Sequence, residues 1–509
     1  MTVEELLRRS GDFGPAQLWL LSLFCAVNLL SSFHYFAQTF ISLNLKTCGS
    51  QHIDYNVTNN GVNNTLGVIF PEMDVKFHSL SNEMGWTCEE GWKMALVQST
   101  YFIGSVLGTL VLGILADSLG RLPMLFTANV FAITGNIMTV YLPANLWSLS
   151  LSRFIAGVAV DTNFFMMYII VMEYIKPSFR TFGLNFCIGV WYCVGCMTVP
   201  WLAVYTQHWR LFLVVISIPM VIIPISTFFM PESAQWLLSR GKTEDAIRCF
   251  KKIATINKKE LSTDFIEQFK ATVSTQNAEI KNGDLIGLFR TPRLRRKTCI
   301  LVFKTMVLTL CYDAMSRNIN SIDMDPFLLF TITSSSIFPS CLVILIFQDR
   351  IGRKAMAVFS LLLTGVFNLV QGIILLYQKD LSPTALAAAG LLARFAVNIA
   401  YNSGTQYAAE LIPTQVRGQG LATIHVIGYG AAFFSPHILY LSNKWISTPE
   451  TILAILSIAG AAFCIFLPET LNKSLPTTLE DGELFGEDEN PWDFLKRKKA
   501  ADTEKTGNP

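Results

Sequence analysis

Two short charged segments share one spacing of aspartate, glycine and arginine. Residues 114–123 read ILADSLGRLP, and residues 346–354 read IFQDRIGRK. Aspartate and arginine in such turns can form ion pairs or bond to helix ends, and glycine permits a tight reversal of the backbone. The expected chemistry is electrostatic: contacts that latch one conformation of the protein and break when it moves. The predicted latch residues in these segments are Asp117, Gly120, Arg121, Asp349, Gly352 and Arg353.

Further charges repeat with matched spacing. Glu173 and Arg180 of EYIKPSFR are as far apart as Glu410 and Arg417 of ELIPTQVRGQG. The segment PESAQWL supplies Glu232, and LPET near the end of the chain repeats its Pro-Glu pair. The alternative explanation is that charged residues generally gather at helix ends. It does not explain why the Glu-to-Arg spacing is equal in both segments. We therefore add these five charged residues to the predicted latch.

Long apolar runs flank all of these segments. The chain has 509 residues, of which 51% are hydrophobic and 15% are charged, with a mean hydropathy of +0.42. Soluble domains contain about 25% charged residues, so this composition indicates a polytopic membrane protein. A membrane-spanning helix needs about 20 apolar residues, and twelve runs satisfy that requirement. They are residues 16–41, 94–115, 123–142, 146–171, 182–205, 210–230, 299–318, 326–347, 355–377, 382–408, 420–442 and 450–467.

The repeated turn falls between the second and third run of each half of the chain. The sequence therefore predicts an all-α integral membrane fold of twelve transmembrane helices in two six-helix halves. Lys and Arg gather in segments that one topology places on the cytoplasmic side, with both termini inside. The predicted parts are a cytoplasmic N-terminus (1–15), an N-terminal half (16–230), a cytoplasmic linker of short amphipathic helices (231–298), a C-terminal half (299–467) and a cytoplasmic tail (468–509).

The first outer loop, residues 42–93, is long in this topology. It contains glycosylation sequons at Asn56 and Asn63 and two cysteines, Cys48 and Cys88. A glycosylated loop closed by a disulfide fits an oxidising exterior. We predict glycosylation of both asparagines, a disulfide between the two cysteines, and a plasma-membrane location.

Polar side chains follow one helical face in several of the apolar runs. A charge in the middle of a span costs about 2.5–3.5 kcal/mol on insertion scales, so such groups usually face a cavity or a partner. Asp161 lies near the middle of the fourth run, and Arg394, Asn398 and Asn402 are four residues apart in the tenth. A water-filled cavity between the halves would explain them. The predicted substrate-binding residues are Tyr35, Gln38, Asp161, Tyr312, Arg394, Asn398, Asn402 and Tyr429.

Each of these residues also has a structural alternative. Asp161 could form an ion pair with Arg394 or with Arg153. Asn398 and Asn402 could join neighbouring helices through hydrogen bonds. The tyrosines of the second half could fill the core, or their faces could hold a quaternary ammonium group by cation–π attraction of about 0.5–2 kcal/mol. These alternatives stay open at the level of sequence.

Several functional classes find no support in the sequence. The formal net charge of +2 gives no reason to expect nucleic acid as a partner. The cysteines show no zinc-site spacing, because CVGC lies inside an apolar run, where small residues suit a packed membrane helix. We find no Ser/His/Asp group, metal cluster or nucleotide loop, and we expect neither an enzyme nor a cofactor. The expected partners are the lipid bilayer and a small organic ion, with sodium or protons open as a coupling ion.

Taken together, the segments resemble the organic cation, anion and zwitterion transporters of the major facilitator superfamily. The resemblance covers nearly the whole chain and includes GDFGPAQ, ADSLGRL, EYIKPSFR, PESAQWLLSRGK, FQDRIGRK, AELIPTQVRGQG and LPET. It implies the major facilitator fold and alternating access around a midplane site, with the repeated turns latching the outward-open state. It departs from the pattern at Leu122 and Pro123, where the family usually has a basic residue after Gly-Arg.

The resemblance gives conflicting information on substrate charge. Arg394 matches a basic residue that family members use near the substrate, whereas Tyr429 stands where cation transporters carry an acid and anion transporters an arginine. The segment HYFAQTF is similar to the anion branch, while Asp161 supplies a negative charge. We expect an organic cation or a carnitine-like zwitterion as the substrate, with an organic anion as the alternative. An alternative of another class is a non-transporting membrane sensor on the same fold.

Overall fold

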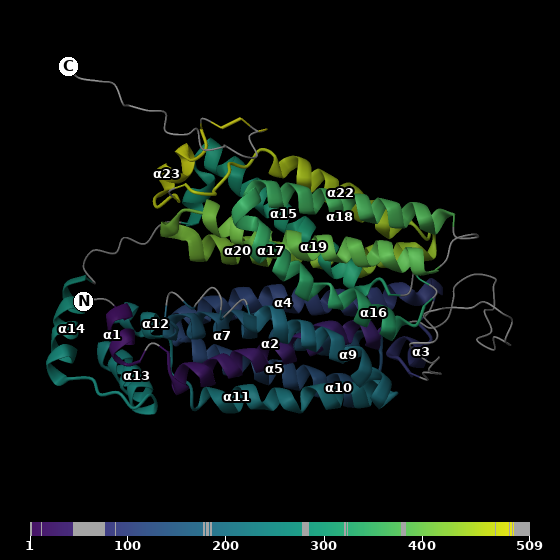
Figure 1. The fold of residues 1–509 in the computed structure, drawn as a ribbon. Coiled ribbons are helices and arrows are strands. Elements are labelled where there is room, and N and C mark those ends of the chain that lie inside the picture. The colour runs from purple at the N-terminus through teal and green to yellow at the C-terminus, as the bar shows by residue number, and fades with distance from the viewer. Residues whose placement is uncertain are drawn as a thin grey trace, which may run out of the picture. The chain divides into compact units, whose positions relative to one another are not determined.

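The computed structural model describes most of the chain as helices joined by short turns (Figure 1). An isolated bridge links His78 and His208, which lie outside the helices. The described residues are 3–11, 13–43, 77–86, 88–176, 179, 183, 186–276, 285–319, 322, 324–377, 383–473, 475–487, 489–490 and 492.

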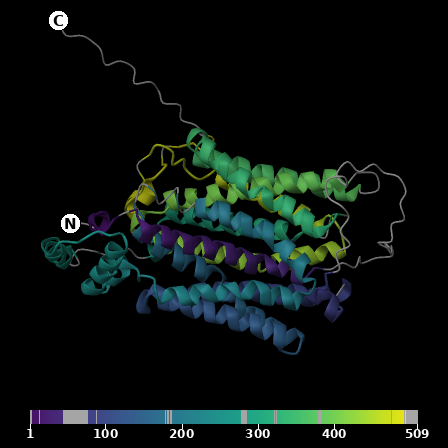
Figure 2. The ribbon, with the colours of Figure 1, turned by 60° about the horizontal axis from the view of Figure 1, so that its bottom comes forward.

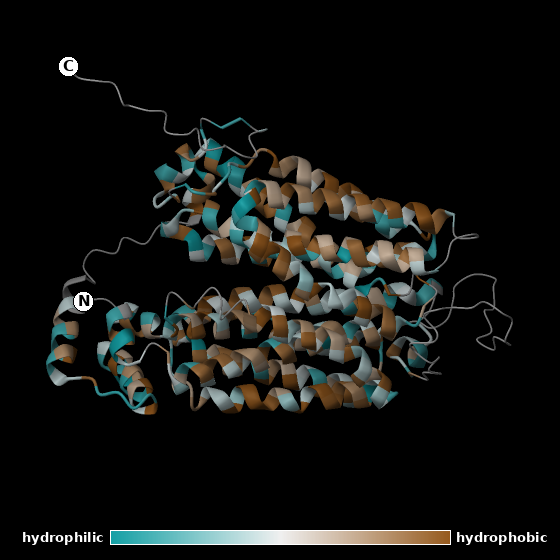
Figure 3. Cartoon of the chain, in the orientation of Figure 1, coloured by the Kyte–Doolittle hydropathy of each residue, from teal (hydrophilic) through white to brown (hydrophobic). Residues whose placement is uncertain are grey.

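Within the described residues, eleven helical stretches are long and apolar enough to cross a membrane. The twelfth predicted run forms a shorter apolar helix, α22 (Thr448–Cys464). Apolar side chains dominate these helices (Figure 3), and many of them are exposed, as expected for a surface that faces lipid. The eleven stretches are α2 (Pro15–Ile41), α4 (Gly91–Leu119), α5 (Arg121–Tyr141), α6 with α7 (Leu146–Tyr174), η2 with α9 (Ile188–Thr206), α10 with η3 and α11 (Trp209–Thr227), α15 (Pro292–Arg317), α16 with α17 (Pro326–Ile351), α18 (Arg353–Leu376), α19 (Pro383–Leu411) and η5 with α20, α21 and η6 (Thr414–Asn443).

Several spans consist of more than one helix, and the start of the seventh differs from the prediction. In the fourth, α6 (Leu146–Gly157) ends before α7 (Val160–Tyr174) begins. The seventh span, α15, begins at Pro292 rather than at residue 299, since proline is favoured in the first turn of a helix. The basic run RTPRLRRK therefore largely belongs to the start of α15 and not to the linker.

The described chain forms two compact units. Unit 1 consists of Met1–Ile280, Ser316–Ser335 and Ala432–Ile446. Unit 2 consists of Lys281–Met315, Ser336–Ala431 and Ser447–Pro509. Parts of the seventh, eighth and eleventh spans are thus grouped with unit 1, although the sequence assigns them to the second half.

The helices of unit 1 run side by side (Figures 1 and 2). The segment GSVLG of α4 allows the backbones of α4 and α6 to approach closely. A Cβ atom on Gly104 would lie 2.1 Å from the carbonyl oxygen of Phe154, and one on Gly108 would lie 2.3 Å from that of Val158. Small residues four apart are typical of tightly packed membrane helices. In lipid no hydrophobic force drives helices together, so their association depends on close van der Waals packing.

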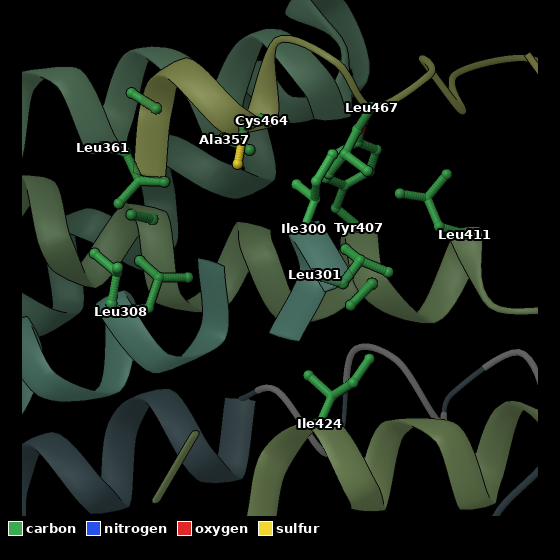
Figure 4. Packing of buried hydrophobic residues seen from close by; sticks show 14 of the residues in the cluster. Ile300, Leu301, Leu308, Ala357, Leu361, Tyr407, Leu411, Ile424, Cys464 and Leu467 are labelled. Carbon is green, nitrogen blue, oxygen red and sulfur yellow. The ribbon is translucent and has the colours of Figure 1, made fainter. Parts of the chain in front are cut away.

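Unit 2 is built around α18, which packs against both α19 and α22. Figure 4 shows the buried side chains between these helices and α15, among them Leu301, Leu361 and Tyr407. The Tyr407 hydroxyl donates to the carbonyl oxygen of Pro468 at 2.7 Å, so the large ring is buried with its polar end satisfied.

Short helices lie before the first span, between the first and second spans, after the sixth span and after the last span. In the linker, α13 is amphipathic and buries Ala246, Ile247 and Phe250 on one face, in keeping with the prediction of amphipathic linker helices. The short helices are α1 (Val3–Arg9), α3 (Leu80–Met84), α12 (Ala234–Ser239), α13 (Thr243–Ile256), α14 (Thr263–Gln276) and α23 (Leu479–Leu484).

One asparagine ties the linker to the beginning of the first span. The Asn257 side chain accepts from the Ala16 N–H at 3.0 Å and donates to the Gly11 carbonyl at 2.9 Å and to Gln17 Oε1 at 3.0 Å. The segment GDFGPAQ therefore serves as the docking point of the linker on unit 1.

Candidate functional site

The predicted acidic residue follows a slight irregularity of the fourth span at Val158 and Ala159, whose backbones keep right-handed helical φ and ψ. Asp161 lies in the first turn of α7, where the positive end of the helix dipole favours a carboxylate. Its side chain is 6% exposed, and its Oδ2 accepts a hydrogen bond of 2.5 Å from the Ser105 hydroxyl on α4. The sequence located this charge in the span correctly, but it gave no sign of the irregularity or of Ser105.

Tyr35 lies under a cation of the protein itself. The Arg317 guanidinium lies 5.3 Å from the centre of the Tyr35 ring and 5.2 Å from that of Phe102, and its Nη2 donates to the Tyr35 carbonyl at 3.4 Å. All three residues belong to unit 1. The Tyr35 face that could hold a quaternary ammonium group is thus occupied by arginine. Arg317 was not among the predicted substrate residues, although its place at the end of an apolar run was a signal.

Gln38, one turn further along α2, is also buried. The Gln98 amide donates to the Gln38 carbonyl oxygen at 3.4 Å. Within the described residues, the Gln38 side-chain nitrogen has no hydrogen-bond partner. A buried donor of this kind is costly unless a ligand or water meets it, which is consistent with the predicted role of Gln38.

A second polar group in unit 1 surrounds Arg153. The guanidinium donates to Thr139 Oγ1 and Asn136 Oδ1, both at 2.9 Å, and the Asn136 amide lies 3.2 Å from His34 Nδ1. These side chains border a cavity of about 20 Å³. That volume suits a water molecule rather than an organic substrate, which needs a pocket of about 300 Å³ or more. We assign this group a structural role.

In unit 2, the polar face of α19 is present as predicted. Arg394 is 1% exposed, and the Asn398 amide donates to Ser336 Oγ at 3.1 Å, next to the start of α17. Asn402 donates to the Asn398 carbonyl at 3.0 Å and is exposed. Asn398 thus links α19 to the start of α17 by a hydrogen bond, which was the structural alternative to substrate binding. Asn402, on the same face of α19, is exposed.

Aromatic pairs occur on α15 and α19 and within the eleventh span. Tyr312 lies 5.4 Å from the ring of Tyr401, and Tyr429 lies 4.7 Å from the ring of His425. Sequence reasoning missed Lys304 of α15, which is 1% exposed and donates to the Gly404 carbonyl at 2.6 Å. A charged residue in a span was the available signal, because such residues are rare in membranes and often functional.

The first repeated turn is held by a glutamate far away in the sequence. Gly120 has φ 111°, and α5 begins directly after it. Glu232 accepts from the backbone N–H groups of Arg121 at 3.0 Å and Leu122 at 3.1 Å, and Arg121 pairs with Asp117 at 2.9 Å. The carboxylate therefore caps the N-terminus of α5, where helices leave N–H groups without a helical partner.

The second repeated turn has the same construction in unit 2. Gly352 has φ 103°, and Glu469 accepts from the N–H groups of Arg353 at 2.9 Å and Lys354 at 3.1 Å. Arg353 pairs with Asp349 at 2.8 Å and with Glu410 at 3.2 Å. Glu469 was not among the predicted latch residues, although LPET matches the Pro-Glu pair that contains Glu232.

A second glutamate supports each capping segment, buried Glu173 in unit 1 and half-buried Glu410 in unit 2. The Ser233 hydroxyl donates to Glu173 at 2.6 Å in unit 1, and the Thr470 hydroxyl donates to Glu410 at 2.5 Å in unit 2. Each hydroxyl directly follows the capping glutamate. The contacts described for these networks lie within their own units, so each network fixes the ends of several helices as one body.

Arg417 donates to the Ile412 carbonyl at 3.2 Å and interacts electrostatically with Glu410 of the second network. Other predicted residues lie outside the described chain. The predicted latch residue Arg180 lies outside the described residues, and so do the glycosylation and disulfide predictions at Asn56, Asn63 and Cys48; for Cys88 only the backbone is described.

Comparison with known proteins decides the family. Residues 60–480 match the family described as sugar (and other) transporter. The chain belongs to this family of major facilitator transporters. The all-α membrane fold predicted from the sequence is thereby confirmed, and so is the prediction that the chain is not an enzyme.

Relatives of this family align along nearly the full chain. The organic cation transporter protein of Drosophila melanogaster is 25% identical over 96% of this chain and 96% of its own length. Human solute carrier family 22 member 13 is 26% identical over 99% of this chain and 97% of its own length. These relatives support the resemblance to organic ion transporters that the sequence motifs indicated.

Solved structures confirm the fold. The inward-open xylose transporter XylE from E. coli has a TM-score of 0.62, with 17% identity, and covers 91% of this chain and 99% of its own. At this identity the likeness concerns the fold alone. Family and fold together establish a multi-pass membrane protein of the transporter type, whose substrates are small molecules.

Proposed function

We propose that this family member carries a small organic zwitterion of the carnitine type across the plasma membrane by alternating access. Both termini would be cytoplasmic, and the repeated turns would latch the outward-open state. The observation that carries the proposal is the buried carboxylate of Asp161 within the fourth span, which accepts a hydrogen bond from the Ser105 hydroxyl. Ionisable residues inside membrane spans typically mark a substrate or ion pathway.

A buried charge of the opposite sign complements Asp161. Arg394 lies on the polar face of α19, in line with Asn398 and Asn402. Asp161 would bind the cationic group of the substrate, and Arg394 its carboxylate.

An organic anion is the second candidate, and a specific contact favours it. Arg317 occupies the aromatic faces of Tyr35 and Phe102, so these rings are not open to an ammonium group. Arg317 in unit 1, and Lys304 and Arg394 in unit 2, would then be the buried cations that attract an anionic substrate. Sodium, protons or the substrate gradient could supply the driving force in either case.

Uptake by cells that express the chain distinguishes these candidates. Three labelled probes would be compared: carnitine, a small organic cation and an organic anion, with sodium and pH varied for each. The zwitterion proposal expects saturable carnitine uptake that falls in both Asp161→Asn and Arg394→Gln. Uptake of the anion alone, retained in Asp161→Asn, would favour the second candidate.

Each matched control removes one charge of the same sign from an exposed residue. Asp264→Asn and Arg248→Gln change exposed residues of the linker helices. The loss of one charged hydrogen bond, about 1.5–3 kcal/mol, corresponds to about 10–100-fold weaker substrate binding. Surface expression is measured in parallel, and unchanged uptake in Asp161→Asn at normal expression would defeat the role of Asp161.

A further inference from the structure

Two histidines and one glutamate converge at the end of unit 1 opposite the first repeated turn (Figure 1). His78 precedes α3, Glu83 lies in α3, and His208 directly precedes α10. One ligand atom of each side chain lies within 4.8 Å of the others. On the predicted topology, this end of the unit faces the exterior.

The backbone holds the two histidines beside each other. The His78 N–H donates to the Gln207 carbonyl at 2.8 Å, and the Trp209 N–H donates to the His78 carbonyl at 3.1 Å. This parallel bridge holds the two backbones side by side, and the two imidazole rings lie 5.3 Å apart. Main-chain geometry therefore keeps the two side chains within reach of one another.

A buried indole orients the glutamate toward this pair. Glu83 Oε2 accepts from Trp209 Nε1 at 2.7 Å, and Oε1 pairs with Arg210 at 2.6 Å. Trp209 is fully buried and so provides a fixed anchor. Hydrogen bonds of this kind position ligating carboxylates in metal sites, and each oxygen keeps a further lone pair for a metal ion.

We propose that His78, Glu83 and His208 bind a Zn²⁺ ion. Imidazole nitrogens and a carboxylate oxygen are typical zinc ligands, and a water molecule would complete the tetrahedron. Zinc–ligand distances of about 2.0–2.2 Å place ligand atoms about 3.3 Å apart, so the cluster must contract by about 1.5 Å or less. Rotation of the exposed His78 side chain can supply that movement. Within the described residues, the ion would join the segment before α3 to the turn between α9 and α10.

Arg210 limits the affinity in two ways. The backbone N–H of Arg210 donates to His208 Nδ1 at 3.2 Å. A neutral imidazole has one nitrogen with a free lone pair, and zinc would take that lone pair. The hydrogen bond is therefore lost whether Nδ1 or Nε2 binds the ion. The Arg210 guanidinium also competes with the ion for Glu83. The site should therefore be weaker than a closed structural zinc site and should exchange its ion readily.

Zinc binding to the purified full-length chain tests the proposal, and it does not depend on the transported substrate. Chelator-treated protein in detergent is titrated with Zn²⁺ by calorimetry, and with Co²⁺ as an absorbance probe of the ligand set. One ion per chain is expected. His78→Ala, His208→Ala and Glu83→Gln should each weaken binding more than about tenfold, since even outer-shell changes cost about 10–100-fold.

Three further variants separate ligation from structural damage. His78→Cys supplies another zinc ligand and should restore binding that His78→Ala loses. Arg210→Gln should strengthen binding several-fold, because it removes the competitor for Glu83. Glu90→Gln, at an exposed glutamate paired with Lys93, should have no effect. Binding that is unchanged in His78→Ala and His208→Ala, or that is not strengthened in Arg210→Gln, would overturn the proposal.

Discussion

The capping glutamate of the first repeated turn offers a direct test of how unit 1 is held together. Glu232 accepts backbone hydrogen bonds from Arg121, Leu122 and Ser233 at 3.0, 3.1 and 2.8 Å. Glu232→Gln keeps the length of the side chain and one acceptor oxygen. It removes the charge and turns an amide donor toward N–H groups that are donors themselves.

The expected loss follows from these contacts. A hydrogen bond to a charged group contributes about 1.5–3 kcal/mol, and a charge at a helix N-terminus contributes about 0.3–1 kcal/mol. Loss of the charge and of one acceptor should therefore cost about 2–3 kcal/mol. For a domain of 150–250 residues, 1 kcal/mol lowers Tm by about 2–4 °C, so Tm should fall by about 4–12 °C.

Thermal unfolding of the purified chain in detergent, followed by tryptophan fluorescence, measures this shift. Glu90→Gln is the matched control, because it breaks an exposed pair with Lys93 worth about 0–1 kcal/mol. Glu232→Asp keeps the charge on a shorter side chain and should fall between the wild type and Glu232→Gln. A Tm for Glu232→Gln equal to that of Glu90→Gln would refute the capping role.

Three further predictions concern other parts of the chain. Gly352→Ala should destabilise the protein by about 1–3 kcal/mol, because φ is 103° and the new Cβ would lie 2.4 Å from the capping carboxylate. The control Gly418→Ala places its Cβ in open space and should leave Tm nearly unchanged, so the Tm values of the two variants are compared. Ser105→Ala should reduce carnitine uptake by about tenfold or less, which is a smaller loss than in Asp161→Asn; an equal loss would contradict a positioning role for the hydroxyl. Burial raises the pKa of the Cys249 thiol above 9.0, so less thiolate exists at neutral pH; its alkylation, measured by peptide mass spectrometry, should be slow in the folded chain, faster with rising pH and fast after denaturation.

The spans could be predicted from the sequence because lipid requires long apolar helices whose backbone groups are satisfied internally. Their ends were harder to place. The helix α15 begins at Pro292 and includes the basic run. Charged residues can form a helix outside the membrane, so the end of the apolar run does not mark the end of the helix. The irregularity at Val158 and Ala159 could not be predicted, because neither residue disfavours a helix by itself; close packing of Val158 against Gly108 accompanies it.

The site residues divide in the same way. The charged turns and the polar face of α19 were visible because spacing along one helix determines which residues share a face. The partners of these residues come from distant segments, as Glu232 does for Arg121, and no local pattern indicates them. The same holds for the cluster of His78 and His208, which the sequence analysis did not anticipate because a main-chain bridge between two loops brings them together.

Counterflow in proteoliposomes that contain only the purified chain tests the transport claim most directly. Vesicles are preloaded with unlabelled carnitine or with buffer, and the entry of labelled carnitine is followed. A carrier that works by alternating access should take up label faster in the preloaded vesicles, and Asp161→Asn should abolish the difference. Specific carnitine binding with no uptake in either set of vesicles would contradict transport and would favour a membrane sensor built on the same fold.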